Sequence, residues 1–331
     1  MRKPKVFVTR EIPEAGLKLI QDSCDVEIWL EDLPPSKETL IEKVRGIDGL
    51  LCLLTDSVDD IVMEAAGSRL KVISNYAVGY DNIDLKCATK RGIPVGNTPG
   101  VLTETTADLA FALLLSAARK IVNGSNYVRE NKWETWGPKL LLGMDIFEST
   151  LGIIGMGRIG QAVARRARGF NMKILYYDHK HRPELGKESS AEICNSIEEV
   201  LRCSDFISLH VPLNNETRFS INRESFRIMK NSAILINTAR GEIVDQEALY
   251  DALSHKVIAY AALDVTTPEP LRGDNKLVLL ENCLIVPHIG SASFRTRNKM
   301  AVMSAENLLA GLTNEKIPYV VNPEVYDVLQ S

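Results

Sequence analysis

Several features that mark other classes of protein are missing from this chain of 331 residues. Its 39 basic residues nearly balance its 43 acidic residues, so neither nucleic acid nor an anionic membrane is expected as a partner. The longest apolar run, residues 109–118, is about half of what a helix needs to span a bilayer, and no signal-peptide pattern follows Met1. We therefore expect a soluble protein of the cytoplasm.

Cysteine is also scarce, and its six residues are scattered without a Cys-x-x-Cys pair or a histidine at ligand spacing. This distribution excludes a disulfide scaffold and offers no candidate metal site, so free thiols in a reducing compartment are expected. What the chain does have is length and an apolar content of 45%. Together they suggest two domains, each able to close its own core.

Short apolar runs alternate with helical patterns along most of the chain. Strands are expected at residues 6–8, 26–29, 50–54 and 72–73, and in a second series at 151–154, 173–177, 206–211, 233–237, 259–264 and 283–286. Helices are expected at 13–22, 37–45, 59–66, 103–118, 159–169, 197–203, 246–254 and 291–312. Repeated strand–helix–strand units predict an α/β protein with parallel sheets, and the six strands of the second series suffice for a dinucleotide-binding fold.

A glycine-rich loop joins the first strand of the second series to a helix. In its G-x-G-x-x-G pattern, Gly155 permits a tight turn, Gly157 lets the backbone approach a pyrophosphate, and Gly160 lets helix and strand pack closely. The next strand ends in Asp178, eighteen residues after Gly160, where a carboxylate that binds ribose hydroxyls is expected. The loop therefore predicts a bound dinucleotide.

The choice between the two nicotinamide dinucleotides depends on the residues around Asp178. Its charge favours NAD(H), because it would repel the 2′-phosphate of NADP(H). Residues 179–182, His-Lys-His-Arg, form a cationic loop that could accept that phosphate, although a solvated loop is the simpler interpretation. NAD(H) is expected to be preferred, without excluding NADP(H).

Three further polar residues follow predicted strands of the second series. Arg240 offers a planar charged fork that can bind a carboxylate and polarise an adjacent keto oxygen. His288, when protonated, could give a proton to that oxygen, and Glu269 would stabilise and orient the charged imidazole. Each residue alone has a simpler structural interpretation. Joined to the dinucleotide loop, they predict hydride transfer from a nicotinamide to a 2-oxo acid, without a metal.

These segments resemble the D-isomer-specific 2-hydroxyacid dehydrogenase family, and the resemblance covers essentially the whole chain. The matching segments are residues 78–84, 155–160, 237–245, 263–271 and 287–292. Within the family, the chain is most similar to the glyoxylate/hydroxypyruvate reductases. The resemblance implies NAD(P)H-dependent reduction of glyoxylate to glycolate or of hydroxypyruvate to D-glycerate. The nearest relatives often carry a small residue and an arginine at the positions of Asp178 and Lys180, so their NADPH preference does not transfer directly.

The same resemblance implies roles for individual residues. The catalytic residues would be Arg240, Glu269 and His288. The cofactor would contact Gly155, Gly157, Arg158, Ile159, Gly160, Asp178, Thr238, Asp264 and Gly290. The substrate would contact the backbone of Val78 and Gly79 as well as Arg240 and His288, with Ser291 next to it.

The resemblance also implies how the chain is organised. Residues 1–100 and 288–331 would form a flavodoxin-like substrate domain, and residues 101–287 an inserted Rossmann domain for the cofactor. Both would be doubly wound parallel sheets. Family members are commonly homodimers joined through the cofactor domains, which would explain why the stretch 109–118 is apolar all round; burial in a large core is the alternative. Trp136 would reach the partner's substrate pocket, or else pack in the dimer interface.

Two alternative functions stay open at this point. A D-3-phosphoglycerate dehydrogenase-like enzyme would need a cationic site for the substrate phosphate. A dinucleotide-sensing corepressor of the same family would bind NADH tightly and turn over no 2-oxo acid. Formate dehydrogenase is disfavoured, because those enzymes look to have a glutamine where this chain has Glu269.

Overall fold

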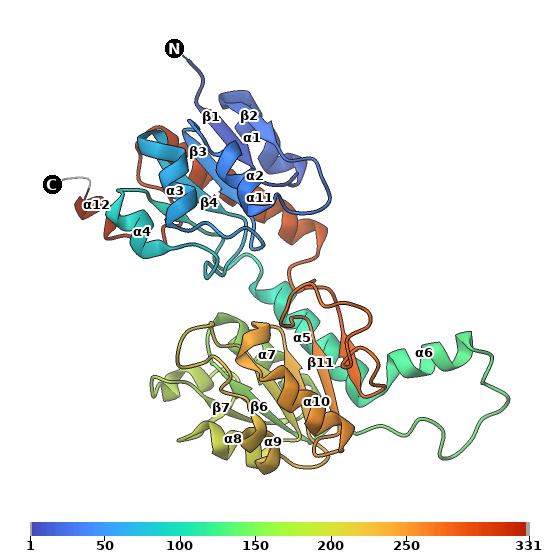
Figure 1. The fold of residues 1–331 in the computed structure, drawn as a ribbon. Coiled ribbons are helices and arrows are strands. Elements are labelled where there is room, and N and C mark those ends of the chain that lie inside the picture. Colours follow the sequence, from blue (N-terminus) through green and yellow to red (C-terminus); the bar gives the residue numbers. More distant parts are fainter. Residues whose placement is uncertain (1, 329–331) are drawn as a thin grey trace. The chain divides into compact units, whose positions relative to one another are not determined.

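The computed structural model describes residues 2–328, which form two compact units, each built on a parallel sheet (Figure 1). The first unit contains the described residues up to Leu102 and those from Ser291 onward, and the second spans Thr103–Gly290. The second unit is therefore inserted into the first in sequence. The expected α/β class with two doubly wound parallel sheets is confirmed.

The sheet of the first unit has five strands in the order β2-β1-β3-β4-β5. These strands are β1 (Lys5–Val8), β2 (Asp25–Ile28), β3 (Gly49–Cys52), β4 (Val72–Asn75) and β5 (Val95–Gly96). This is the flavodoxin-like order, in which ligands bind beyond the carboxyl ends of the strands. Strand β5 was not expected, because two residues are too few to give a periodic pattern.

Helices cover both faces of this sheet. They are α1 (Glu14–Ser23), α2 (Lys37–Lys43), α3 (Asp60–Ala66), α4 (Leu85–Lys90), α11 (Phe294–Leu312) and α12 (Val325–Val328), with a 3-10 turn η1 (Gly67–Arg69). Successive side chains of β1 point to opposite faces of the sheet and so belong to two separate cores. Val6 and Val8 pack towards α1 and α11, while Phe7 packs towards α2 and α3. Helix α11 lies beside α1 although they are far apart in sequence (Figure 1).

The second unit contains a parallel sheet of seven strands in the order β12-β11-β10-β9-β6-β7-β8. The strands are β6 (Thr150–Ile154), β7 (Lys173–Tyr177), β8 (Glu192–Ile193), β9 (Phe206–Leu209), β10 (Ile234–Asn237), β11 (Tyr260–Leu263) and β12 (Cys283–Ile285). The first six of them, in chain order, have the 3-2-1-4-5-6 arrangement of a Rossmann fold. All six expected strands are present, and the short edge strand β8 is the additional one.

Six helices accompany this sheet: α5 (Thr103–Ala118), α6 (Ile121–Arg129), α7 (Arg158–Ala167), α8 (Ile197–Cys203), α9 (Arg223–Ile228) and α10 (Gln246–Ser254). Short 3-10 turns η2 (Arg168–Phe170), η3 (Pro183–Gly186) and η4 (Gly241–Ile243) complete the unit. Buried side chains of α5 and α7 form one core with the sheet, and those of α8, α9 and α10 form the other. No helix within residues 2–328 is long and apolar enough to cross a bilayer.

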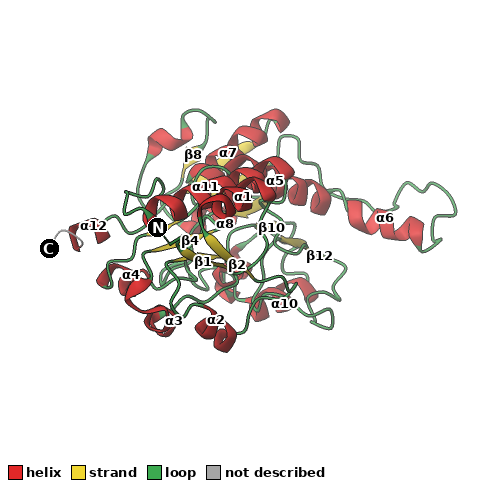
Figure 2. Cartoon of the chain, turned by 90° about the horizontal axis from the view of Figure 1, so that it is seen from above, coloured by secondary structure: helices red, strands yellow, loops and turns green. Residues whose placement is uncertain are grey.

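Helix α5 contains the apolar stretch 109–118, which was expected to be buried either in a large core or between subunits. Seven of its apolar side chains are at most 5% exposed: Ala107, Ala110, Phe111, Leu113, Leu114, Ala117 and Ala118. They face α7, β10 and β11 of the same unit, so this side of the helix is buried in a large core, whereas Leu109 and Leu115 are half-buried and Ala112 is exposed. Helix α6 and the segment after it differ, because they extend away from the rest of their unit in both views (Figures 1 and 2).

Candidate active site

The glycine loop connects β6 to α7. Gly155 has a φ of +96°, and a Cβ atom there would lie 2.6 Å from the carbonyl oxygen of His210. A Cβ on Gly160 would lie 2.2 Å from the carbonyl oxygen of Gly155. A Cβ on Gly157, in contrast, would meet no atom within 4 Å. Gly155 and Gly160 are thus required by the fold, whereas the open space at Gly157, ahead of the α7 N-terminus, fits the pyrophosphate of a dinucleotide.

Asp178 follows β7 and ties the glycine loop to the end of that strand. Its Oδ2 accepts a hydrogen bond from the amide of Met156 (3.0 Å), and its Oδ1 accepts one from the amide of Lys180 (3.3 Å). The same Oδ1 accepts a hydrogen bond from Nη2 of Arg182 (2.9 Å). Only 7% of the Asp178 side chain is exposed. The carboxylate stands at the expected position, but Arg182 already compensates part of its charge.

The loop after β10 carries Thr238 and Arg240. The hydroxyl oxygen of Thr238 is buried and lacks a hydrogen-bond partner among the residues described, as expected of a group that meets a ligand. Asn237 fixes the backbone of this loop, because its Nδ2 donates to the carbonyl oxygen of Arg240 (2.8 Å). The guanidinium of Arg240 is half-buried and donates from Nη1 to the carbonyl oxygen of Ala239 (2.8 Å).

Glu269 and His288 form a direct pair. Oε1 of Glu269 lies 2.5 Å from Nδ1 of His288. Because a carboxylate accepts, Nδ1 carries a proton and Nε2 is the nitrogen left for a substrate. The two side chains are 35% and 25% exposed, so both remain accessible. Arg240, Glu269 and His288 follow β10, β11 and β12, three adjacent strands of one sheet.

The backbone around His288 is held by Asp264. His288 has a φ of +51°, a left-handed conformation that is rare for a residue with a side chain. Its amide donates to the carbonyl oxygen of Asp264 (3.0 Å), while the amides of Ile289 and Gly290 donate to the Asp264 carboxylate at 2.6 and 2.8 Å. Burial raises the pKa of Asp264, against the opposing effect of these amides. Asp264 therefore fixes the turn that presents the histidine.

Val78 and Gly79 follow β4 in the first unit. Neither amide N–H donates a hydrogen bond to a protein group within residues 2–328. Both carbonyl oxygens are engaged, that of Val78 by Asn97 and that of Gly79 by Asn75. Two neighbouring free amides at the carboxyl end of a strand fit the carboxylate of a small acid. Ser291, the first residue of the chain to re-enter this unit, is half-buried.

One residue at the strand ends was missed by sequence reasoning. His210 follows β9, and its Nε2 forms a hydrogen bond with the hydroxyl of Ser208 (2.8 Å). Burial of the ring lowers the pKa of His210 to about 4, so it is uncharged at neutral pH. The sequence placed it inside the expected strand 206–211, so no signal marked it as a residue at a strand end. Arg158 and Ile159 lie in the first turn of α7, exposed and half-buried, respectively.

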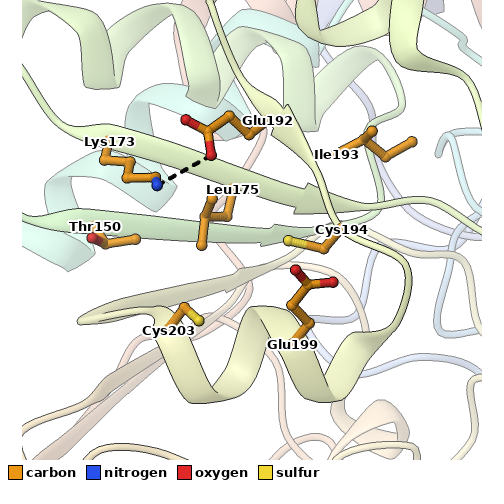
Figure 3. A pocket seen from close by; sticks show the side chains of 8 residues that line it. All are labelled: Thr150, Lys173, Leu175, Glu192, Ile193, Cys194, Glu199 and Cys203. Atoms are coloured by element: carbon orange, nitrogen blue, oxygen red, sulfur yellow. Dashed lines mark ion pairs between the residues drawn. The ribbon is translucent and has the colours of Figure 1, made fainter.

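A hollow of about 200 Å³ lies elsewhere in the second unit (Figure 3). It is lined by Thr150, Lys173, Leu175, Glu192, Ile193, Cys194, Glu199 and Cys203. Thr150 and Lys173 are the first residues of β6 and β7, so the hollow lies at the amino ends of the strands, away from the edge where ligands of parallel sheets bind. Burial raises the pKa of Cys194 to about 11, which leaves its thiol protonated and unreactive. We assign no part of the reaction to this hollow.

Glycine loop, Rossmann topology and strand-end residues together define the second unit as the nucleotide-binding domain of a nicotinamide-dependent dehydrogenase. A model of the D-isomer specific 2-hydroxyacid dehydrogenase, NAD binding domain, matches residues 111–290. The chain belongs to the D-isomer specific 2-hydroxyacid dehydrogenase family. Among residues 2–328, no group of three or more His, Cys, Asp or Glu side chains could hold a metal ion.

Relatives match the chain over nearly its full length. It is 55% identical to a glyoxylate reductase of Korarchaeum cryptofilum, with 98% of both chains covered. It is 50% identical to a glyoxylate reductase of Pyrococcus horikoshii, again with 98% of both covered. Among solved structures, an NADPH-dependent glyoxylate/hydroxypyruvate reductase of Sinorhizobium meliloti in complex with NADP and malonate matches with a TM-score of 0.87, 29% identity and 98% of each chain covered.

Proposed function

We propose that this dehydrogenase reduces small 2-oxo acids, glyoxylate to glycolate and hydroxypyruvate to D-glycerate, at the expense of NAD(P)H. The observation that carries the proposal is the pairing of His288 with Glu269 (2.5 Å), which leaves an imidazole nitrogen for the substrate. Full-length similarity to glyoxylate reductases supports the same substrates. It gives no support to a phosphoglycerate dehydrogenase or a corepressor.

The chemistry follows from the residues at the strand ends. The amides of Val78 and Gly79 bind the substrate carboxylate, and Arg240 binds the same end of the molecule and polarises the keto oxygen. When bound, the nicotinamide supplies the hydride. His288 donates a proton from Nε2 to the keto oxygen, while Glu269 stabilises the charged imidazole and holds its orientation through Nδ1.

The residues proposed to hold the cofactor follow the carboxyl ends of β6, β7, β10, β11 and β12. They are Gly155, Gly157, Arg158, Ile159, Gly160, Asp178, Thr238, Asp264 and Gly290. The open space at Gly157 and the unpaired hydroxyl of Thr238 support this assignment. Ser291 lies next to the substrate in this proposal. The proposed substrate domain, residues 1–100 and 288–331, and the proposed cofactor domain, residues 101–287, differ by two or three residues from the division of the structure after Leu102 and after Gly290.

NADH is proposed as the preferred reductant, because the Asp178 carboxylate lies at the end of β7, where the adenosine ribose binds in Rossmann folds. The 2.9 Å bond from Arg182 weakens the repulsion that a 2′-phosphate would meet. We therefore propose that NADPH is accepted at lower efficiency. Within residues 2–328, the other basic side chain that contacts Asp178 is His179, whose Nδ1 lies 3.6 Å from Oδ1 of the carboxylate.

A homodimer is proposed on the evidence of an exposed apolar surface on α6 and the segment after it. The exposed apolar side chains here are Ile121, Val122, Val128, Trp133, Trp136, Leu140, Leu142 and Phe147. Trp136 is 78% exposed, so it is available to a second copy of the chain, either in the interface or at the partner's substrate pocket.

All six cysteines are free, which supports a cytoplasmic location.

The experiment that tests the proposed function is a spectrophotometric panel. Glyoxylate, hydroxypyruvate, pyruvate and phosphohydroxypyruvate are each offered with NADH and with NADPH. We expect the highest kcat/KM for glyoxylate or hydroxypyruvate. Highest efficiency with phosphohydroxypyruvate would replace the proposal with a phosphoglycerate dehydrogenase, and tight NADH binding without turnover of any 2-oxo acid would replace it with a sensor.

A further inference from the structure

The segment after β4 is anchored by the carbonyl oxygens of three consecutive residues. The carbonyl of Ala77 accepts from the amide of Thr98 (2.9 Å), that of Val78 from Nδ2 of Asn97 (2.7 Å), and that of Gly79 from Nδ2 of Asn75 (2.8 Å). All three donors lie outside the segment itself. The direction of every carbonyl from Ala77 to Gly79 is therefore imposed by neighbouring strand ends.

Fixing these carbonyls also fixes the amides. In a trans peptide the C=O and N–H bonds point in opposite directions, and the cis peptide bonds within residues 2–328 are both elsewhere, before Pro268 and Pro270. The carbonyl of Val78 shares its peptide with the N–H of Gly79, so the bond from Asn97 directs that N–H away from Asn97. A hydrogen bond to the carbonyl also polarises the peptide and strengthens its N–H as a donor.

Asn97 is itself firmly held. It follows β5 and is 6% exposed. Its amide donates to the carbonyl oxygen of Tyr319 (3.1 Å), and its own carbonyl accepts from Nδ2 of Asn307 (2.9 Å). The segment that supplies the donor is thus fixed on both sides by the C-terminal part of the same unit. A rigid donor of this kind can hold a loop in a single conformation.

Asn75 holds the next peptide in the same way. It is the last residue of β4 and is fully buried. Its Nδ2 is shared between the carbonyl of Gly79 (2.8 Å) and Oδ1 of Asn82 (3.1 Å). Asn82 in turn donates to the carbonyl oxygens of Leu53 and Asp56, both at 3.0 Å, in the loop after β3. The turn is therefore braced against the neighbouring strand end.

We propose that Asn97 is a positioning residue for substrate binding, which directs the N–H of Gly79 at the carboxylate of the 2-oxo acid, with Asn75 fixing the peptide that follows. This role presupposes the proposed binding of that carboxylate by Val78 and Gly79. Asn97 itself touches neither substrate nor cofactor in this proposal. It acts through the peptide that it holds.

The kinetic consequence can be stated in advance. The substrate carboxylate keeps its charge from the bound ground state through the transition state, so its contacts contribute equally to both. Weakening such a contact raises KM and leaves kcat nearly unchanged. A general loss of folded structure would instead lower the fraction of active enzyme and with it kcat. A rise in KM at nearly constant kcat therefore indicates a positioning role, whereas a fall in kcat indicates a structural role.

The test compares Asn97→Asp with a matched control, Asn322→Asp. Both replacements keep the side-chain shape but exchange an amide donor for a carboxylate. Like Asn97, Asn322 is buried in the first unit and donates from Nδ2 to a backbone carbonyl, that of Ile93 (3.0 Å). Its Oδ1 accepts from the amide of Val95 (2.8 Å), a bond that a carboxylate preserves. It makes no bond to the Val78–Gly79 turn, so only the first variant disturbs the turn.

We expect Asn97→Asp to raise the KM for glyoxylate about tenfold or more and the inhibition constant of oxalate by a similar factor, with kcat within about threefold of wild type. The Kd for NADH, measured by fluorescence, should stay within about twofold, because the glycine loop is untouched. Asn322→Asp should lower the melting temperature as well, yet leave KM and oxalate inhibition unchanged. Equal effects of the two variants on KM, or no effect of either, would overturn the proposal.

A second variant keeps the proposal testable if Asn97→Asp fails to fold. Asn97→Ser is smaller and uncharged and cannot reach the carbonyl of Val78, so KM and oxalate inhibition should again rise while kcat changes little. Unchanged values in this variant would also overturn the proposal. Failure of the underlying function looks different, because wild-type enzyme would then neither reduce glyoxylate nor be inhibited by oxalate.

Discussion

Nδ1 of His288 lies 2.5 Å from Oε1 of Glu269, and the two residues belong to segments that follow neighbouring strands, β12 and β11. The pair is held from behind by Asp264, whose carboxylate binds the amides of Ile289 and Gly290. The position of His288 is thus fixed by two different carboxylates. One contacts the ring and the other contacts the backbone.

The first prediction concerns these residues. His288→Ala should lower kcat for glyoxylate by about 10²- to 10⁴-fold, and Glu269→Gln by a smaller factor, because the proton donor is lost in one case and loses its counter-charge in the other. Arg240→Ala should lose turnover as well. NADH affinity, measured by fluorescence, should be unchanged in all three. The matched control is Glu247→Gln, which breaks an exposed ion pair with Lys276 and should leave kcat unaltered. Near-normal turnover by His288→Ala would show that another group supplies the proton.

A second prediction separates the glycines of the loop. Gly157→Ala should leave the melting temperature unchanged, since a Cβ there meets no atom within 4 Å, but should raise the Kd for NADH about tenfold or more by filling space needed by the pyrophosphate. Gly155→Ala should instead lower the melting temperature, because the residue has a φ of +96° and its Cβ would clash with the carbonyl of His210. Thermal unfolding and NADH titration of both variants check this, and an unaltered Kd in Gly157→Ala would contradict it.

Cofactor preference provides a third prediction. Arg182→Ala should increase the preference for NADH over NADPH about tenfold, because Asp178 then keeps its full charge against a 2′-phosphate. Asp178→Ala should shift the preference towards NADPH. Lys180→Ala is the matched control, since it removes a charge from the same loop, whereas only the backbone amide of Lys180 bonds to Asp178. The measurement is kcat/KM and Kd with both cofactors. A wild-type preference for NADPH would contradict the interpretation of Asp178.

The fourth prediction concerns assembly through α6. We expect sedimentation of a dimer for the wild type and dissociation of Val128→Asp, which places a charge on a side chain of α6 that is 51% exposed. Trp136→Ala distinguishes two roles for that tryptophan. A weaker dimer indicates interface packing, whereas an intact dimer with altered KM for hydroxypyruvate indicates contact with the partner's substrate. A wild-type monomer at micromolar concentration would rule out both.

The fifth prediction follows from His210. Its folded-state pKa of about 4 lies below the unfolded value near 6.5, so the unfolded chain binds more protons between these values. The free energy of unfolding therefore keeps its full value above pH 6.5, where the ring is neutral in both states, and it decreases as the pH falls towards 4. The wild type should lose about 2 kcal/mol between pH 7.5 and pH 5 that His210→Asn does not lose. Urea unfolding at the two pH values measures the difference, and parallel losses in both proteins would contradict it.

The sequence predicted the framework well, because four-residue buried strands are continuous apolar runs and their helices have clear periodic faces. It missed β5 and β8, each of two residues, and the short helices α4, α9 and α12. It also missed α6, none of whose residues is buried. Tertiary pairing, rather than local preference, determines these elements.

At the site, the residues found from sequence are those whose position after a strand has a direct chemical interpretation, such as His288 and Arg240. Asn97 and Asn75 were missed, since an asparagine after a strand is usually a turn residue. Their importance depends on which carbonyl each amide meets, and that follows only from the packing of β4 beside β5. Arg182 was suggested by its charge, but its bond to Asp178 required the structure.

The packing of α11 against α1 has a consequence for the order in which the protein is made. Gly16 approaches Ala301 so closely that a Cβ would lie 2.2 Å from its carbonyl oxygen, so the first unit completes its core only after the ribosome has passed α11. The strands of the second unit are contiguous in sequence, and that unit can close while the rest is still being synthesised. The first unit thus begins to be synthesised before the second but completes its fold after it. The apolar side chains of its N-terminal segments stay partly exposed while nearly two hundred further residues are translated.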